Sequence, residues 1–396
     1  MNSIFSDRIS SVPQSFIREI LKVAVDPSII SFAGGLPNPE LFPVEDIKQA
    51  TKTVLDQYGV DALQYSNTEG FEPLRALISK RYKEKQGLDV PVENILITTG
   101  SQQGLDLLGK VLINENDDLV IEEPGYLGAI QAFSVYRAMF RPVPVNAEGM
   151  NCDALQQVIS EKNPKLMYTV PNFQNPSGIT YTEENRKQVA DILRGTRTML
   201  IEDNPYGDLR FEGEDKTSFA GLIPDNTILL GSFSKTIVPA FRLGWVVAPD
   251  YIMEKLVIAK QAADLHSNYF AQRVIHQYLI DHDLDEHVNK IINLYRTQKQ
   301  AMMASIENHF PDNVEYTNPE GGMFLWASLP NQLSAMKLFE LAIKDKVAFV
   351  PGDPFYVDNK VSSTFRLNYT SADETTIEEG IARLAKAIKK FTDNPK

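Results

Sequence analysis

The feature that most constrains the fold is a series of short apolar runs between residues 94 and 248, separated by helical segments. The runs read NILITT, DLVIEE, FRPVPV, KLMYTV, TMLIED, TILLGS and LGWVVA. Several are apolar at successive positions, which is typical of strands whose two faces are both covered by helices. The intervening segments, such as 105–112 and 183–193, have the length of crossover helices that join parallel strands. The sequence therefore predicts an α/β domain built on a mostly parallel, seven-stranded sheet.

Two domains are expected. The large domain covers about residues 45–300, and a smaller α+β domain combines residues 1–44 with residues 301–396. Helical periodicity begins at Val44, and the stretch 285–310 predicts a long helix that leads out of the large domain. The remaining C-terminal part alternates strand-like runs such as VAFVPGDPF and TFRLNYT with helices.

The composition excludes several classes of function. With 39 basic and 52 acidic residues the net charge is −13, which gives nucleic acid or an anionic membrane no positive surface to bind. Cys152 is the single cysteine, so an internal disulfide and a cysteine–metal cluster are excluded. The N-terminus lacks the apolar core of a signal peptide, and no run approaches the roughly 18 apolar residues of a membrane span. We expect a cytoplasmic protein without a catalytic metal, because the histidines form no HExxH motif.

The segment GSFSKTIVPAFR carries the strongest chemical signal. Residues 227–231 read as a strand, and Ser232, Ser234 and Lys235 follow at the sheet edge where ligands bind in α/β folds. A lysine packed there loses its proton more readily and can condense with an aldehyde. The two hydroxyls and Arg242, seven residues beyond the lysine, are suited to a phosphate. A lysine taken alone is usually a surface residue, and the SxSK-x6-R arrangement makes this one a candidate nucleophile.

Other candidates follow other strands, each with a plainer alternative. Ser101 and Gln102 begin a helix whose free amides would bind an anion, although Ser101 could serve only as a helix cap. Asp203 ends the run TMLIED, where it would pair with a protonated pyridine nitrogen or cap a loop. Asn175 lies in a loop rich in Pro and Gly, either as a donor to a cofactor oxygen or as a turn residue.

Two further candidates, Tyr126 and Arg366, also have both a functional and a structural interpretation. Tyr126 follows the turn after DLVIEE, where its ring would lie on a flat cofactor or would simply fill the core. Arg366 lies in the strand-like run TFRLNYT, where an arginine needs a partner. That partner would be a substrate carboxylate bound in a bidentate manner, or an acidic residue of the protein.

Taken together, the motifs resemble the fold type I aminotransferases of class I/II, over nearly the whole chain and in the family's order. The phrases IISFAGGLPNPELFP, LQYSNTEGFEPLR, ITTGSQQGLDL, GAIQAF and GSFSK are most similar to those of 2-aminoadipate aminotransferases, including LysN-type and kynurenine/2-aminoadipate enzymes. The resemblance implies the PLP-transferase fold, with pyridoxal 5′-phosphate (PLP) as cofactor and a homodimer with shared active sites.

The resemblance also implies a role for each matching residue. Lys235, Asp203 and Tyr126 would be catalytic: the lysine attaches to the cofactor and then moves a proton, the carboxylate pairs with the ring nitrogen, and the tyrosine stacks on the ring. The phosphate would be surrounded by Ser101, Gln102, Ser232, Ser234 and Arg242.

The remaining implied roles concern the ring hydroxyl and the substrate. Asn175 and Tyr206 would hydrogen-bond the ring hydroxyl oxygen, and Arg366 would bind the substrate α-carboxylate close to Gly35 and Asn175. Tyr65 would reach the cofactor and substrate of the neighbouring subunit. Arg18 matches the position of a mobile N-terminal arginine that binds acidic side chains.

The expected reaction is a ping-pong transamination between an L-amino acid and a 2-oxo acid such as 2-oxoglutarate. Candidate donors are 2-aminoadipate, glutamate, and aromatic, kynurenine-like or branched-chain amino acids. A PLP-dependent lyase or decarboxylase on the same scaffold is the alternative. A ligand-sensing regulator is a third reading, disfavoured because the resemblance begins near residue 16 and because no basic DNA-binding element is present.

Overall fold

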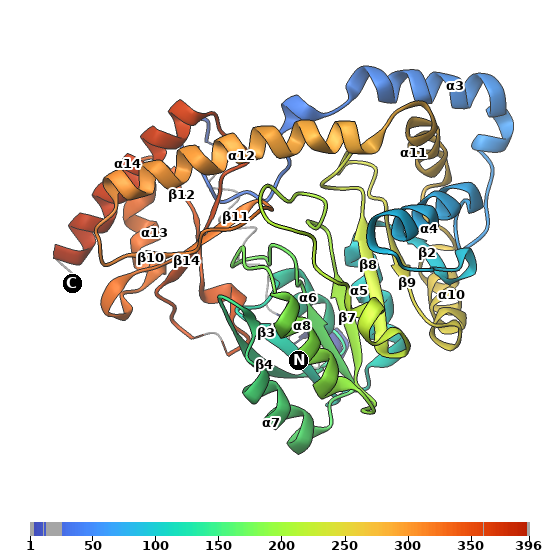
Figure 1. The fold of residues 1–396 in the computed structure, drawn as a ribbon, viewed down its shortest axis with the longest axis horizontal. Coiled ribbons are helices and arrows are strands. Elements are labelled where there is room, and N and C mark those ends of the chain that lie inside the picture. Colours follow the sequence, from blue (N-terminus) through green and yellow to red (C-terminus); the bar gives the residue numbers. More distant parts are fainter. Residues whose placement is uncertain (1–3, 11, 13–25, 359, 394–396) are drawn as a thin grey trace.

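The framework of the protein is an eight-stranded sheet with the order β2-β9-β8-β7-β6-β3-β4-β5 (Figure 1). The computed structural model describes residues 4–10, 12, 26–358 and 360–393. The strands of the sheet are β2 (Ile95–Thr98), β3 (Asp118–Glu123), β4 (Met139–Asn146), β5 (Gly149–Met150), β6 (Leu166–Thr169), β7 (Met199–Asp203), β8 (Thr227–Ser232) and β9 (Gly244–Val247). The pairings among β4, β3, β6, β7 and β8 are parallel, and β9 is antiparallel to β2 and β8. The predicted mostly parallel sheet is confirmed: all seven predicted runs form its strands, and β5 adds an eighth.

The α-helices of the described chain pack around this sheet and beyond it. They are α1 (Asp7–Ser10), α3 (Val44–Ala62), α4 (Glu72–Gln86), α5 (Gly100–Leu112), α6 (Leu127–Ser134), α7 (Cys152–Lys162), α8 (Glu183–Leu193), α9 (Phe219–Leu222), α10 (Asp250–Asp264), α11 (Tyr269–Asp281), α12 (Leu284–His309), α13 (Ala335–Lys344) and α14 (Glu374–Asp393).

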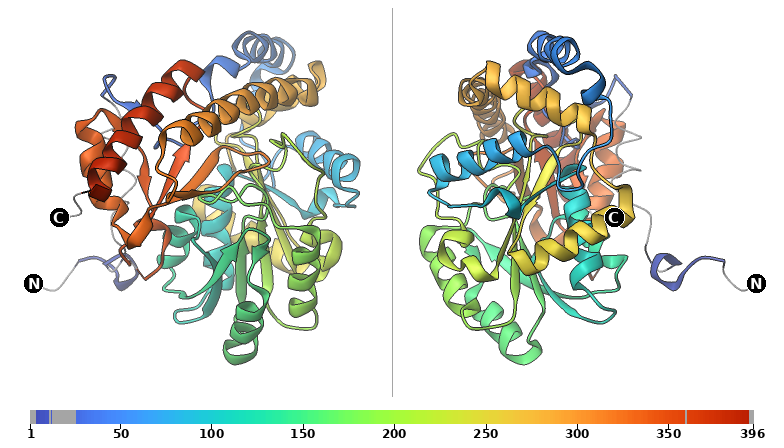
Figure 2. Two further views of the ribbon diagram at one scale, coloured as in Figure 1. Left: turned by 60° about the vertical axis from the view of Figure 1, so that its left-hand side comes forward. Right: turned by 90° about the vertical axis from the view of Figure 1, so that its right-hand side faces the viewer.

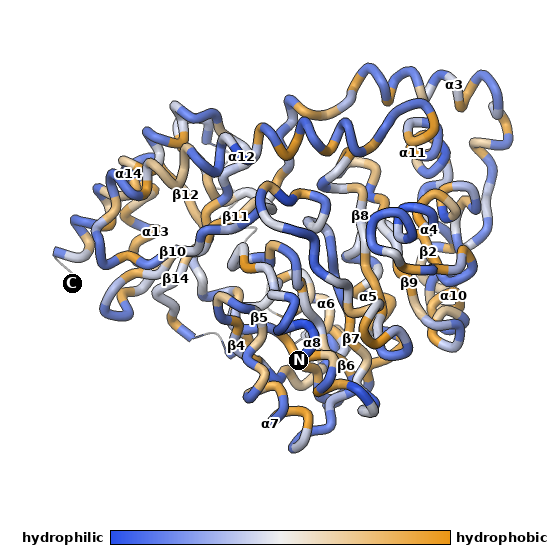
Figure 3. Tube along the Cα trace, in the orientation of Figure 1, coloured by the Kyte–Doolittle hydropathy of each residue, from blue (hydrophilic) through white to orange (hydrophobic). Residues whose placement is uncertain are grey.

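Both faces of the sheet are covered, because successive strand residues point to opposite sides. Ile201 of β7 packs in the cluster that contains residues of α5, α6 and α10, whereas its neighbour Leu200 packs with α7 and α8. Near β2 and β9, the helices α4 and α11 cover the sheet face to which Ile97 and Val247 point, and these two residues pack in one cluster with residues of both helices. Figure 3 shows the apolar residues concentrated along β8 and β9. Each central strand is therefore apolar on both faces, as its sequence predicted.

A second, antiparallel sheet has the order β10-β11-β14-β13 and lies beside the first (Figure 2). Its strands are β10 (Glu315–Tyr316), β11 (Phe324–Ser328), β13 (Val350–Pro351) and β14 (Thr364–Asn368). The long helix α12, predicted from the sequence, runs from α11 to this sheet (Figure 1). The helix α14 packs against α12. Its buried apolar residues recur at the spacing of an amphipathic helix and include Ile377, Ile381, Leu384 and Ile388. The domain boundaries at residues 45 and 300 stay a prediction.

The N-terminal segment joins the C-terminal part of the chain. β1 (Ile30–Ser31) pairs in parallel with β12 (Val347–Ala348). Beyond it, the Phe32 amide donates to Ala348 O at 2.8 Å, and Phe32 O accepts from the Asn368 amide at 2.9 Å. The segment that follows, residues 33–36, is thereby held beside β14, and its carbonyl groups become available to the functional site.

No helix within the described ranges has both the length and the apolar character needed to cross a membrane. The cytoplasmic location expected from the sequence stays a prediction.

Candidate active site

A cavity of about 360 Å³ lies at the carboxyl ends of β6, β7 and β8, where ligands bind in sheets of this kind. Its walls contain all but two of the residues predicted for the site: Gly35, Ser101, Gln102, Tyr126, Asn175, Asp203, Tyr206, Ser232, Ser234, Lys235, Arg242 and Arg366. Tyr65 is not part of these walls, and 79% of it is exposed to solvent. Arg18 lies outside the residues that the structure describes. The fold thus gathers residues that are up to about 330 positions apart in the sequence.

Lys235 points into this cavity from the segment that follows β8. Its Nζ donates a hydrogen bond to the carbonyl oxygen of Gly35 at 2.8 Å. Burial lowers the pKa of Lys235 from 10.5 to about 8, and the positive charges of Arg366 and Arg242 act in the same direction. A substantial fraction of this lysine is therefore neutral near pH 8, and a neutral amine is the form that attacks an aldehyde.

Asp203, the last residue of β7, offers a buried carboxylate oxygen to the cavity. Its Oδ2 accepts a hydrogen bond from the Tyr168 hydroxyl at 2.8 Å, while its Oδ1 is buried and has no hydrogen-bond partner among the described residues. Burial raises the pKa of Asp203 to about 7, although the hydrogen bond from Tyr168 opposes this shift. A buried carboxylate oxygen without a partner is costly. A protonated pyridine nitrogen is a cation of the kind that this oxygen requires.

The start of α5 is suited to a phosphate, because the amides of the first helical turn have no acceptor within the helix. Gly100 has a φ of 72°, and a Cβ atom there would lie 2.6 Å from Nη2 of Arg242. The guanidinium therefore packs directly on the helix start, and only glycine allows this approach. Ser232, the last residue of β8, and Ser234 line the same cavity, and the Ser234 amide donates to the Ser232 hydroxyl at 3.0 Å.

The Nε2 of Gln102 donates to the Gly128 carbonyl of α6 at 2.8 Å, and the role predicted for this residue at the phosphate stays a prediction. The amide group of this side chain is thus held by the protein itself. Its backbone still belongs to the first turn of α5, which is the part that would face an anion.

Arg366, on β14, also lines the cavity. Its Nη1 donates to Asn175 Oδ1 and its Nη2 to Ala33 O, both at 2.8 Å, whereas its buried Nε has no partner among the described residues. Its Cζ lies 4.2 Å from the ring centre of Phe324. Burial lowers the pKa of Arg366 to about 10, so the group remains a cation at neutral pH. A fixed, buried guanidinium of this kind is suited to a carboxylate.

The sequence did not single out four residues that also line the cavity: Tyr168, Val170, Pro205 and Phe324. Tyr168 lies on β6 inside a run that is apolar on both faces, so no periodicity distinguishes it from core residues. Its ring lies 6.5 Å from that of Tyr126, with 25° between the two planes. The only available signal was a hydroxyl within a buried strand, which usually has a hydrogen-bond partner.

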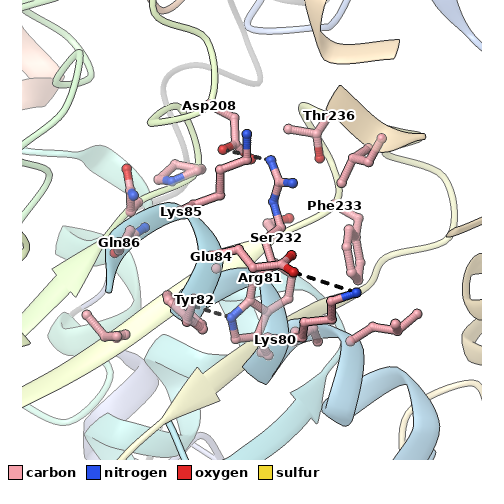
Figure 4. Close-up of a pocket in the computed structure, with 18 of the residues that line it drawn as sticks. Lys80, Arg81, Tyr82, Glu84, Lys85, Gln86, Asp208, Ser232, Phe233 and Thr236 are labelled. Atoms are coloured by element: carbon pink, nitrogen blue, oxygen red, sulfur yellow. Dashed lines mark hydrogen bonds and ion pairs between the residues drawn. The ribbon is translucent and has the colours of Figure 1, made fainter. Parts of the chain in front are cut away.

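A second cavity, of about 210 Å³, lies between α4 and the ends of β7 and β8 (Figure 4). Pro205 and Ser232 line both cavities. Arg81 pairs there with Asp208 at 3.1 Å and Lys80 with Glu84 at 3.6 Å. Lys235, Asp203 and Arg366 line only the first cavity, so the predicted chemistry belongs to that one.

The residues of the first cavity fit PLP. The partnerless Oδ1 of Asp203 suits a pyridinium nitrogen, the start of α5 with Arg242 suits a phosphate, and Lys235 suits an aldehyde. Within the described ranges, no group of three or more His, Cys, Asp or Glu side chains is placed to hold a metal ion. The site therefore has the donor set of a PLP enzyme and no competing metal centre among these residues.

Comparison with known proteins agrees with this reading. Residues 29–384 match the family Aminotransferase class I and II. The chain is 42% identical to aromatic-amino-acid aminotransferase 1 of Thermococcus litoralis, over 97% of this chain and 94% of the relative. It is 40% identical to the 2-aminoadipate transaminase of Thermus thermophilus, over 97% of this chain and 96% of the relative.

Among solved structures, the kynurenine aminotransferase of Pyrococcus horikoshii in complex with PMP is 41% identical. The match covers 98% of this chain and 97% of that chain, with a TM-score of 0.94. The similarity thus extends over the whole fold and over the strand ends that carry the cavity. The chain belongs to the class I and II aminotransferase family and is a PLP-dependent transaminase.

Proposed function

We propose that this transaminase uses both dicarboxylic and aromatic L-amino acids as donors, with 2-aminoadipate, glutamate and kynurenine as test substrates, and 2-oxoglutarate as acceptor. The observation that carries the proposal is the cavity itself, which Arg366 lines together with the aromatic residues Tyr126, Tyr206 and Phe324, its Cζ lying 4.2 Å from the ring centre of Phe324. The relatives named above act on aromatic amino acids, 2-aminoadipate and kynurenine. This combination supports a broad donor range.

Each residue has one task in the proposed ping-pong reaction. PLP, when bound, withdraws electrons from the substrate Cα and makes its proton acidic. Asp203 Oδ1 keeps the proton on the ring nitrogen, and Arg366 holds the substrate α-carboxylate so that Cα lies near Lys235. Lys235 Nζ, which is neutral above about pH 8, takes the proton from Cα and returns it at the C4′ position.

The supporting residues orient the ring and the phosphate. Asn175 Nδ2 donates to the Tyr206 hydroxyl at 3.3 Å, and both groups would then bind the ring hydroxyl oxygen. Tyr126 would lie on the ring face. The groups proposed for the phosphate are the first turn of α5 with Ser101 and Gln102, together with Ser232, Ser234 and Arg242.

Recognition of a second carboxylate requires one more cation. The cations that line the cavity among the described residues are Lys235, Arg242 and Arg366, and the proposal assigns each of them to another group. We therefore propose that Arg18 binds the side-chain carboxylate of an acidic substrate. An aromatic donor would instead place its ring against Phe324 and Tyr206 and would not need Arg18.

We further propose a homodimer in which Tyr65 serves the partner's site. Tyr65 is 79% exposed, and nearby apolar side chains are exposed as well, including Val60 at 83% and Leu63 at 70%. The Tyr65 ring contacts the His266 ring edge-on, at 5.8 Å between centres. Exposed apolar groups gathered in one region favour a protein–protein contact.

The decisive experiment measures kcat/KM for 2-aminoadipate, glutamate, kynurenine and phenylalanine with 2-oxoglutarate, on the wild type and on Arg18→Ala. Loss of one charge-assisted contact corresponds to about a ten-fold to hundred-fold change. We expect that loss for the two acidic donors and less than about a two-fold change for the two aromatic donors. Equal effects on both classes, or none, would exclude Arg18 as the acid-recognising group.

A separate control tests the chemistry. Lys235→Ala should be colourless and inactive, and borohydride should fix the cofactor on Lys235 of the wild type. In a single turnover the wild type should release a 2-oxo acid without ammonia; release of ammonia would indicate elimination.

A further inference from the structure

A fully buried lysine, Lys260 near the end of α10, lies beside the start of α5. Its Nζ donates to Gln103 Oε1 and to Ser267 Oγ, both at 2.9 Å, and forms an ion pair with Asp264 at 2.6 Å. The proposed reaction gives this cation no role. A buried ammonium is costly even when it is paired, so the contacts that it makes are informative.

Gln103 connects Lys260 to the N-terminal turn of α5, which we define as residues 99–103, that is, the N-cap Thr99 and the first four helical residues. The Gln103 Oε1 that accepts from Lys260 also accepts from the Thr99 amide at 2.8 Å. Its Nε2 donates to Asp264 Oδ2 at 2.8 Å. Gln103 therefore spans the turn and fixes Thr99, and the direction of the amides that follow at Gly100 and Ser101 depends on that residue.

Ser267 connects the same lysine to the strand that precedes the turn. Its hydroxyl donates to Ile97 O of β2 at 3.2 Å and lies 3.3 Å from Thr99 Oγ1. Lys260 thus holds the end of β2 through Ser267 and the start of α5 through Gln103. An ammonium offers three donors, and here they meet an amide oxygen, a hydroxyl and a carboxylate. A neutral apolar side chain would fill the volume and would orient none of these groups.

We propose that Lys260 is a positioning residue for the phosphate of the cofactor: it fixes Gln103 and Ser267 and, through them, aims the amides of the turn 99–103 at the phosphate. Lys260 touches neither the cofactor nor the reacting atoms. The inference rests on the proposed placement of the phosphate at the start of α5.

The test compares two ligands that differ only in the phosphate, PLP and pyridoxal. Their dissociation constants are measured by absorbance on enzyme stripped of its cofactor, with Tm as the measure of folding. The variants are Lys260→Met and the charge-balanced Lys260→Met/Asp264→Asn. The matched control is Lys299→Met, because Lys299 is also buried, at 5% exposure, and pairs with Glu212 at 3.8 Å.

For both Lys260 variants we expect the Kd for PLP to rise about ten-fold or more and the Kd for pyridoxal to change less than about two-fold. Lys299→Met should lower Tm and leave both constants as they are. Equal weakening of PLP and pyridoxal by the Lys260 variants would show a general structural role and overturn the inference, and so would an unchanged Kd for PLP. If Lys260→Met does not fold, the same comparison of PLP with pyridoxal is made on the double variant Lys260→Met/Asp264→Asn, in which the carboxylate is neutralised as well.

The variant Gly100→Ala distinguishes the proposed role of Lys260 from the proposed placement of the phosphate at the start of α5, on which that role depends. If Gly100→Ala weakens PLP selectively and the Lys260 variants do not, the phosphate site stands and the role of Lys260 is refuted. If none of these variants is selective for PLP, the placement of the phosphate is wrong as well.

Discussion

Removing the Tyr168 hydroxyl should lower the fraction of Asp203 that is ionised at neutral pH, without changing the shape of the cavity. Both side chains are buried, at 0% and 2% exposure, and the hydroxyl lies 2.8 Å from Asp203 Oδ2. A hydrogen bond to a charged group contributes about 1.5–3 kcal/mol. This corresponds to about one to two pKa units, or roughly a ten-fold to hundred-fold change in an equilibrium. In Tyr168→Phe, the pKa of Asp203 should therefore rise further above its value of about 7.

The sign of the pH dependence follows from that shift. With a wild-type pKa of about 7, half of Asp203 is charged at pH 7, and a rise of one to two units leaves roughly a tenth to a hundredth of it charged, so PLP affinity and kcat/KM should fall by about five-fold to fifty-fold. Raising the pH above the new pKa restores the carboxylate, so the deficit should shrink toward pH 9. The assay is the Kd for PLP and kcat/KM with glutamate, measured from pH 6 to pH 9.

Tyr181→Phe is the matched control for this experiment. Tyr181 is also fully buried, and its hydroxyl donates to a buried carboxylate, Glu122, at 2.8 Å. Glu122 does not line the cavity. The control should therefore lower Tm and keep the wild-type Kd for PLP. If the two variants show the same PLP affinity and the same pH profile, the proposed role of Tyr168 is wrong.

Two further predictions follow from the site. Because the pKa of the free Lys235 amine is lowered to about 8, kcat of the wild type, which reports the complex in which the substrate has displaced Lys235 from the cofactor, should rise with pH and level off above about pH 8; a kcat that is flat from pH 6 to pH 9 would contradict a neutral Lys235 as the base. Arg366→Lys keeps the charge and loses the planar fork, so the KM for every amino-acid donor should rise by about ten-fold or more, as measured by initial rates; an unchanged KM would place the α-carboxylate elsewhere.

Local chemistry made much of the fold predictable. Several of the runs that became β2–β4 and β6–β9 are apolar at successive positions, which is typical of strands covered by helices on both faces. The helix 183–193 was predicted as a crossover between strands at the bounds that the structure gives it, and the structure shows Thr182 capping its first turn. The two-residue strand β5 left no such signal, since a pattern of two residues has no period.

The site was predictable where a residue type and a strand end coincide, as at Lys235 and Asp203. It was not predictable where a side chain acts through a contact between distant segments. Tyr168 looks like a core tyrosine in the sequence, and the carbonyl groups of Ala33 and Gly35 carry no sequence information at all. The same holds for Lys260, which reads as one more helical lysine until its partners Gln103 and Ser267 are known.

By itself, the sequence determined the layered sheet, the order of the motifs and the choice of Lys235 as the candidate nucleophile, because apolar periodicity and residue type are local properties. Only the tertiary structure decided which oxygen of Asp203 is left without a partner, which carbonyl groups meet Lys235 and Arg366, and how far burial moves their pKa values. These quantities depend on distance and on exclusion of water, and packing between segments that are far apart in the chain sets both.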